Sequence, residues 1–109
     1  NMASATSRNT YPNASPYVTS KFAVAGLTRT VAVEYADRDI RINAICPGNV
    51  ATPLVVSLVE DLSVLATKHA IKRLGTPEEV ANGVMFLASD LSSFSTGSLL
   101  EVDGGWNAI

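Results

Sequence analysis

The chain has 109 residues, of which 47% are hydrophobic and 17% charged, and its formal net charge is −2. This composition is typical of a globular domain and excludes a disordered chain, while the lack of a basic run argues against a nucleic-acid partner. No apolar run is as long as a membrane-spanning helix, which needs about 18 residues. The single cysteine, Cys46, cannot form an internal disulfide. We therefore expect one soluble domain in a reducing compartment, the cytoplasm.

The first predicted elements are a strand end, a loop and a long helix. Residues 4–16 are rich in Ser, Thr, Asn and Pro and predict a loop. Because Asn1 leads into this loop almost at once, we interpret residues before Ser4 as the end of a strand, and the chain as the C-terminal part of a longer one. From Tyr17 to about Arg38 apolar residues occupy nearly every face of a predicted helix. Such a helix is buried on more than one side, with a sheet and a partner subunit as candidates.

The middle of the chain predicts a buried strand and a second helix. Residues Ile40–Cys46 are rich in branched apolar side chains and are bounded by Pro47-Gly48, which indicates a strand buried on both faces. Residues 51–70 then predict a helix, with Thr52 as its N-cap and Pro53 at its first position.

The last elements are a helix with a strong start signal and a second strand. Thr76 is the predicted N-cap, Pro77 follows it, and Glu79 completes a capping box. The strand is predicted over Ser98–Val102, before two glycines. The order of strands and intervening helices predicts a parallel α/β sheet, the C-terminal half of a doubly wound, Rossmann-type domain, with residues 1–109 forming a partial single domain.

Polar candidates gather where the predicted strands end, which is where such sheets bind ligands. Tyr17 and Lys21 stand four residues apart, so they share one face of the helix. A nearby ammonium lowers the pKa of a phenol from about 10, which suits it to exchange a proton with an alcohol or carbonyl. Ser4 can donate a hydrogen bond to the same oxygen. The alternative is that Tyr17 and Lys21 are an ordinary surface pair.

Several motifs occur together and in order. Ser4 precedes Tyr17 by 13 residues, and Tyr-x-x-x-Lys is followed by "NAICPGNVATP" (43–53), "RLGTPEEVA" (73–81), "FLASD" (86–90) and "VDGG" (102–105). In this arrangement the chain resembles the short-chain dehydrogenase/reductases. Ser7 lies only 10 residues before Tyr17 and fits the serine position less well.

The resemblance implies a role for each matching position. Tyr17 would be the general acid/base, Lys21 would lower its pKa and bind the nicotinamide ribose, and Ser4 would position the substrate oxygen. Four further residues would line the nicotinamide and adjoining phosphate of NAD or NADP: Pro47, Gly48, Val50 and Thr52. The physical chemistry agrees, since glycine permits close approach to a ring and a capped helix start favours phosphate. The implied function is hydride transfer to or from a small alcohol or ketone, by a homodimer or homotetramer in the full-length form.

The chain also departs from the family. No Gly-x-x-x-Gly-x-Gly fingerprint occurs, and the family's catalytic asparagine and the residue that selects NAD or NADP have no counterpart. We therefore expect little activity from the isolated chain. The alternative function is a catalytically incompetent oligomerisation module that associates through the helices at 17–38 and 77–89. An isomerase or dehydratase with the same Tyr/Lys pair is a third possibility.

For the remaining candidate residues the sequence mainly indicates structural roles. Cys46 is predicted to be a small core residue, and His69 a solvated residue near a helix end. No group of residues has metal-ligand spacing. Trp106 either closes the substrate pocket or packs at a subunit contact. Residues 53–73, which determine substrate specificity in the family, are mostly aliphatic, as an apolar lid or ordinary helix packing would require.

Overall fold

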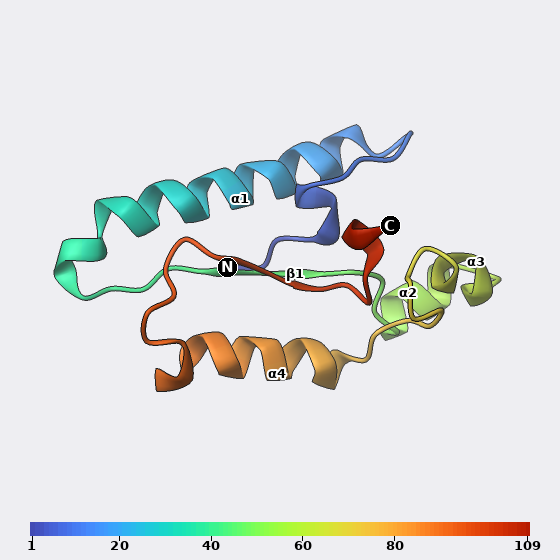
Figure 1. Cartoon of the computed structure of the whole chain (residues 1–109). Coiled ribbons are helices and arrows are strands. Elements are labelled where there is room, and N and C mark those ends of the chain that lie inside the picture. The colour runs from blue at the N-terminus through green and yellow to red at the C-terminus, as the bar shows by residue number, and fades with distance from the viewer.

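The computed structural model describes all 109 residues and is built on a small parallel sheet (Figure 1). Strand β1 (Ala44–Pro47) pairs with β2 (Leu99–Val102) in parallel, with Ala44 opposite Leu99 and Pro47 opposite Val102. On its other side β1 bonds the first residues of the chain. Ala3 N–H donates to Ile45 O at 2.9 Å, and Ile45 N–H donates to Asn1 O at 3.0 Å. The parallel sheet and the strand end before Ser4 are thus confirmed.

Helices cover both faces of this sheet. Figure 1 shows α1 (Ser15–Glu34) on one side of the strands and α4 (Pro77–Ala88) on the other. The short helices α2 (Pro53–Leu58) and α3 (Leu62–Ala66) lie beyond the carboxyl end of β1. The predicted α/β class and the order of helices and strands are confirmed.

The strand β1 contributes to the core on both faces. Ala44 and Cys46 form a buried cluster with Ala3, against which Val24 of α1 packs. Ile45 points to the opposite face, as the alternation of a strand requires. There it meets Gly83 of α4, where an added β-carbon would overlap with the Ile45 Cδ1 atom. A larger residue there would require the Ile45 side chain to shift, so glycine lets α4 lie close to the sheet.

The long helix differs from its predicted bounds at both ends. It begins at Ser15, because Pro16 fits the first turn of a helix, where no N–H donor is needed. It ends at Glu34, rather than near Arg38, and one 3₁₀ turn (Ala36–Arg38) follows. Asp39 then adopts a left-handed conformation with φ of 58°, which ends the helical path.

The single helix predicted over residues 51–70 is wrong, because the segment forms two short helices. Thr52 caps the first as predicted, and its Oγ1 accepts from Val55 N–H at 3.3 Å. Val59 is extended, with φ of −123° and ψ of 114°. Asp61 then starts α3 by accepting from Ser63 N–H at 2.9 Å. Asp61 is a good N-cap, so it favours a new helix start over continuation of the first.

The predicted strands are longer than those observed. Residues 40–43 do not form a strand ladder. Ile42 N–H donates instead to the side chain of Thr96 at 3.1 Å, and Ile42 O accepts from Gly97 N–H at 2.8 Å. These bonds to a loop replace regular pairing, so β1 starts at Ala44. The start of α4 is as predicted, with a complete capping box between Thr76 and Glu79.

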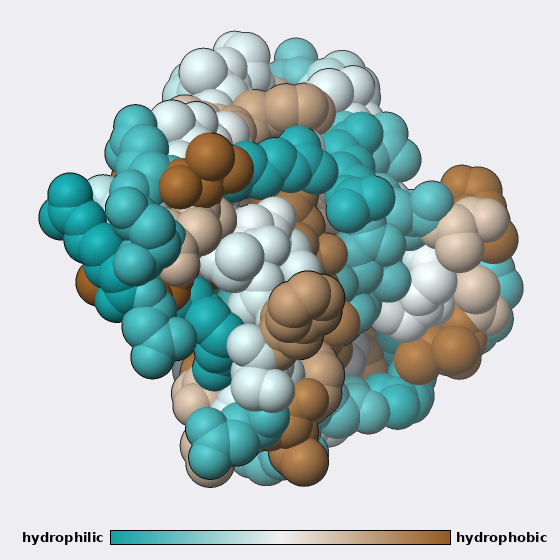
Figure 2. Space-filling model, turned by 60° about the vertical axis from the view of Figure 1, so that its left-hand side comes forward, coloured by the Kyte–Doolittle hydropathy of each residue, from teal (hydrophilic) through white to brown (hydrophobic).

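The helices bury only one side each. Helix α1 turns Ala25, Thr28 and Ala32 toward the sheet, while Leu27 is 56% exposed and Val33 80% exposed. Figure 2 shows apolar side chains in separate patches among hydrophilic ones on one face of the molecule. The prediction that one side of α1 packs against the sheet is thus confirmed. No helix in the structure combines the length and the apolar character that crossing a membrane requires.

Candidate active site

Ser4 lies at the carboxyl end of the N-terminal strand segment and caps a 3₁₀ turn (Ala5–Ser7). Its Oγ accepts from Thr6 N–H at 3.2 Å, and its own N–H donates to Ser7 Oγ at the same distance. The Ser4 side chain is nearly buried, with 7% exposure. Its hydroxyl proton is not donated to any group of the chain, so it remains available to an oxygen outside it.

Lys21 joins the Tyr17 ring to this strand end. Its Nζ lies 5.6 Å from the centre of the Tyr17 ring and donates to Met2 O at 3.2 Å. The backbone of Lys21 is also fixed, because Ser7 Oγ donates to Lys21 O at 3.0 Å. Two contacts therefore connect the first turns of α1 to the segment that contains Ser4.

The Tyr17 hydroxyl makes no hydrogen bond within the chain, and the side chain is 45% exposed. A phenol that only filled a core would be buried with a partner for its hydroxyl. Here the hydroxyl has no partner, and the Lys21 ammonium lies 5.6 Å from the centre of the same ring. A free phenol beside an ammonium group has the chemistry to exchange a proton with an external oxygen.

The segment Pro47–Thr52 begins at the last residue of β1 and is bonded to Val102 and to Gly75. Gly48 N–H donates to Val102 O at 3.1 Å, and Gly75 is bonded twice, through Asn49 O at 2.9 Å and Ala51 N–H at 2.9 Å. Because successive backbone groups of an extended segment point in opposite directions, the Val50 N–H faces away from Gly75. It makes no hydrogen bond within the chain. Val50 therefore offers a free donor of the kind that a carboxamide oxygen would accept.

Gly48 and Thr52, in the same segment, have mainly structural contacts. The ring that requires glycine at position 48 is the imidazole of His69, because a β-carbon there would lie 2.5 Å from its Cε1 atom. Thr52 caps α2, but that helix has only six residues, so its dipole contributes little to binding a phosphate.

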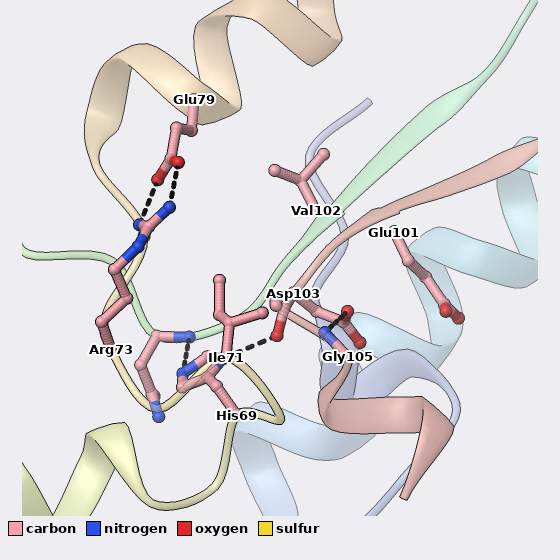
Figure 3. A pocket seen from close by; sticks show the side chains of 11 residues that line it. His69, Ile71, Arg73, Glu79, Glu101, Val102, Asp103 and Gly105 are labelled. Carbon is pink, nitrogen blue, oxygen red and sulfur yellow. Dashed lines mark hydrogen bonds and ion pairs between the residues drawn. The ribbon is translucent and has the colours of Figure 1, made fainter.

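The structure corrects the prediction for His69, which is buried rather than solvated, with 1% exposure. Its Nδ1 lies 2.6 Å from Asp103 O, and its Nε2 accepts from Asn49 N–H at 3.3 Å (Figure 3). The ring also stands edge-on to Trp106, with centres 5.6 Å apart. Nothing in the local sequence signals this environment, because the contacts come from segments 20 and 34 residues away.

A cavity of about 260 Å³ lies beside His69. Its other lining residues include Asn49, Arg73, Glu79 and Asp103, and none of Ser4, Tyr17 and Lys21 lines it. Figure 3 shows Arg73 and Glu79 pointing toward one another at its edge. Since that ion pair already satisfies both charges, the cavity offers few free polar groups, and the Tyr17 surface is the better candidate for chemistry.

Glu79 and Cys46 have pKa values displaced from the ordinary range of their side chains. Hydrogen bonds from Arg73, then from Thr76 N–H, lower the pKa of Glu79 to about 2. Burial raises the pKa of the Cys46 thiol, which fits the predicted core role. No group of three or more His, Cys, Asp and Glu side chains in the structure could hold a metal ion.

Three contacts, of Asn107 and of Lys68, were not predicted from the sequence. Asn107 Nδ2 donates to Ala5 O at 3.1 Å and so connects the last residues to the turn that Ser4 caps. Lys68 Nζ lies 5.3 Å from the ring centre of Tyr11 and 5.5 Å from that of Trp106. The C-terminal segment, the end of the α3 region and the loop before α1 therefore meet near one another.

Comparison with known proteins identifies relatives along the whole chain. The family model described as enoyl-(acyl carrier protein) reductase matches residues 1–107. The cis-4-hydroxycyclohexanecarboxylate dehydrogenase of Sinomonas cyclohexanicum is 49% identical over 98 residues, covering 89% of this chain and 39% of that relative. The chain thus spans about two fifths of the length of this relative.

Comparison with solved structures also finds dehydrogenases among the similar proteins. The aldohexose dehydrogenase of Thermoplasma acidophilum superimposes with a TM-score of 0.91 at 41% identity, covering 100% of this chain and 47% of that one. The structure of ElxO with NADP bound gives a TM-score of 0.94 at 35% identity, covering 100% of this chain and 46% of that one. With the sequence motifs, the parallel sheet and these relatives in agreement, the chain belongs to the short-chain dehydrogenase/reductase family.

Proposed function

We propose that this chain carries the catalytic residues of an NAD(P)-dependent oxidoreductase that interconverts a small alcohol and its ketone or aldehyde. The observation that carries the proposal is the placement of Lys21. Its ammonium donates to Met2 O at the strand end and lies 5.6 Å from the Tyr17 ring, whose hydroxyl is free. Relatives support the reaction class, since they include dehydrogenases acting on a hydroxycyclohexanecarboxylate and on an aldohexose.

In this proposal each residue has a distinct task. When bound, the dinucleotide supplies or accepts the hydride. Tyr17 Oη donates a proton to the substrate oxygen during reduction and removes it during oxidation. Lys21 stabilises the phenolate that the proton transfer leaves behind. Ser4 donates its hydroxyl proton to the substrate oxygen while charge develops there.

The proposed cofactor segment is Pro47–Thr52, with Pro47, Gly48, Val50 and Thr52 beside the nicotinamide end, and Tyr17 and Lys21 opposite. The free N–H of Val50 supports this role, because a carboxamide oxygen is a suitable acceptor for it. The relative with NADP bound supports a nicotinamide dinucleotide as the ligand class. We further propose a cytoplasmic location, which the single buried thiol of Cys46 supports.

The test is a fluorescence titration of the purified 109-residue chain with NADH and NADPH in parallel, followed by turnover with cyclic secondary alcohols and their ketones. Saturable binding of one dinucleotide would support the proposed cofactor segment, and because the chain lacks the Gly-rich fingerprint we expect any turnover by the isolated chain to be low. Tyr17→Phe should retain this binding and lose turnover by about a hundredfold or more, because only the acid/base group is removed. Equal turnover by the Tyr17→Phe variant would contradict the assignment of Tyr17.

A second candidate is supported by the exposed apolar side chains of two helices. Leu27 and Val33 on α1, and Met85 on α4 with 66% exposure, have no covering partner in the chain. We propose that these faces join copies into a homodimer or homotetramer. If the chain binds neither dinucleotide but forms a defined oligomer that Leu27→Lys dissociates, its function is association rather than catalysis. Light scattering coupled to gel filtration measures this directly.

A further inference from the structure

His69 occupies a position where three segments of the chain meet. It follows α3, its backbone N–H donates to Ala66 O at 3.1 Å, and its ring is enclosed between the ends of β1 and β2. Figure 3 shows His69 beside Asp103 in this pocket. A buried imidazole with both ring nitrogens bonded has a more specific role than filling space, for which an apolar ring would serve as well.

The two bonds of the ring define one chemical form. A backbone carbonyl only accepts, so the Nδ1 atom, 2.6 Å from Asp103 O, carries a proton. A backbone N–H only donates, so the Nε2 atom, 3.3 Å from Asn49 N, carries a lone pair. His69 is therefore neutral and in the Nδ1–H tautomer. Neither the other tautomer nor the charged ring satisfies both partners.

The bond from Asn49 N–H fixes the plane of the peptide between Gly48 and Asn49. In a trans peptide the N–H and C=O groups point in opposite directions, so the Gly48 carbonyl points away from the imidazole. The next group, Asn49 O, accepts from Gly75 N–H at 2.9 Å. The Val50 N–H lies in the same peptide as Asn49 O, so the bond to Gly75 directs it away from Gly75, and it makes no hydrogen bond within the chain. The ring thus holds the peptide before Asn49 and Gly75 holds the peptide after it, and together the two bonds set the path of the segment that presents the Val50 N–H.

We propose that His69 is a positioning residue, which holds the Gly48–Asn49 peptide so that the backbone of Pro47–Thr52 presents the Val50 N–H to the nicotinamide. The cofactor part of this inference rests on the proposed function. The inference that His69 holds the Gly48–Asn49 peptide is independent of the proposed function, because it follows from the hydrogen bonds of the His69 ring. Gly48 belongs to the same arrangement, because any larger residue would collide with the ring.

Two substitutions separate the two bonds of the ring. In His69→Asn, the side-chain amide overlies Nδ1 and can still donate to Asp103 O, whereas Asn49 N–H loses its acceptor. In His69→Gln, the longer side chain places an amide oxygen near the Nε2 position, where it can accept from Asn49 N–H. Both variants remove the ring and its contact with Trp106, so each is a control for the other.

The direct measurement is amide hydrogen exchange of Asn49 in the ¹⁵N-labelled chain, with the Gly97 amide, which donates to Ile42 O at 2.8 Å, as an internal reference. We expect His69→Asn to speed exchange of Asn49 relative to Gly97 by about three- to tenfold, the change expected for loss of one neutral hydrogen bond. His69→Gln should retain more of the protection than His69→Asn. Equal effects of both variants, or none, would overturn the proposal.

The wild-type protein provides a test that does not depend on the variants folding. Long-range ¹H–¹⁵N correlation of the imidazole at neutral pH should report a proton on Nδ1 and none on Nε2. A proton on Nε2 would overturn the proposal outright. In the dinucleotide titration, His69→Asn should weaken binding more than His69→Gln does. If the wild-type chain binds no dinucleotide, the proposed function fails at that step, while exchange and tautomer still decide the role of His69.

Discussion

The imidazole of His69 occupies the space that a side chain at position 48 would need, and Gly48 has none. A β-carbon at position 48 would be 2.5 Å from Cε1 of His69, and 3.0 Å from both Cα and O of Asp103. The proposed cofactor segment therefore packs against the protein's own aromatic ring. This contact connects the Pro-Gly motif after β1 with a histidine that no motif includes.

Gly48→Ala should destabilise the fold by about 1–3 kcal/mol, the usual cost of overpacking a filled site. In a His69→Ala background the cost should be smaller but not zero, because the Asp103 backbone remains in place. Urea unfolding of the two single variants and the double variant measures the coupling. Gly26→Ala is the matched control, because nothing lies within 4 Å of an added β-carbon there. It should stabilise α1 by about 1 kcal/mol. An unchanged cost of Gly48→Ala without the ring would show that His69 does not restrict this position.

The pair Arg73–Glu79 should make stability depend on acid pH. The pKa of Glu79 is about 2 in the folded chain, below its ordinary value of 4.5. Since the folded state favours the charged form, the contribution is complete above about pH 4.5 and is lost as pH falls toward 2. The Tm advantage of the wild type over Glu79→Gln should shrink across this window, and it should be modest because the pair is exposed to solvent.

Glu78→Gln is the control for this experiment, since it removes a neighbouring carboxylate that forms no ion pair in the structure. Its Tm difference from the wild type should vary less between pH 5 and pH 2. The same acid dependence in both variants would assign the effect to the charge at the start of α4 in general, and not to the bond with Arg73.

The thiol of Cys46 should resist modification in the folded protein. It is 1% exposed, and burial raises its pKa, so little thiolate forms near neutral pH. An aromatic disulfide reagent should react only as fast as the chain opens, and reach one thiol per chain at once in denaturant. Rapid and complete labelling under native conditions would contradict the packing of β1 against Ala3 and Val24.

Replacing Arg41 by lysine should lower the free energy of unfolding. Its guanidinium donates to Leu87 O at 3.0 Å, Ser89 O at 3.2 Å and Ser95 O at 3.3 Å, and to Ser92 Oγ at 2.9 Å. These bonds satisfy carbonyls at the end of α4, which a single ammonium cannot reach together. Arg41→Lys should cost about 1–3 kcal/mol in the free energy of unfolding. Arg29→Lys, on the exposed side of α1, should cost almost nothing, and equal costs would contradict this role.

The elements with local signals were predictable from the sequence. The start of α4 depends on Thr76, Pro77 and Glu79, all within four residues, and Thr52 starts α2 in the same way. Tyr17 and Lys21 share a helix face for an equally local reason. The order of these elements, with the branched apolar run before Pro47, was enough to predict the parallel sheet.

Only the tertiary structure decided what surrounds each residue. His69 has no apolar pattern or cap signal around it, and its partners Asn49 and Asp103 are 20 and 34 residues away along the chain. The packing of Gly83 on Ile45 likewise depends on how closely α4 approaches the sheet. Hydrogen bonds within a few residues follow from local backbone preferences, and a sequence states these directly. Burial and ring tautomer depend on groups that meet only when the sheet assembles, and the assembled fold determines them.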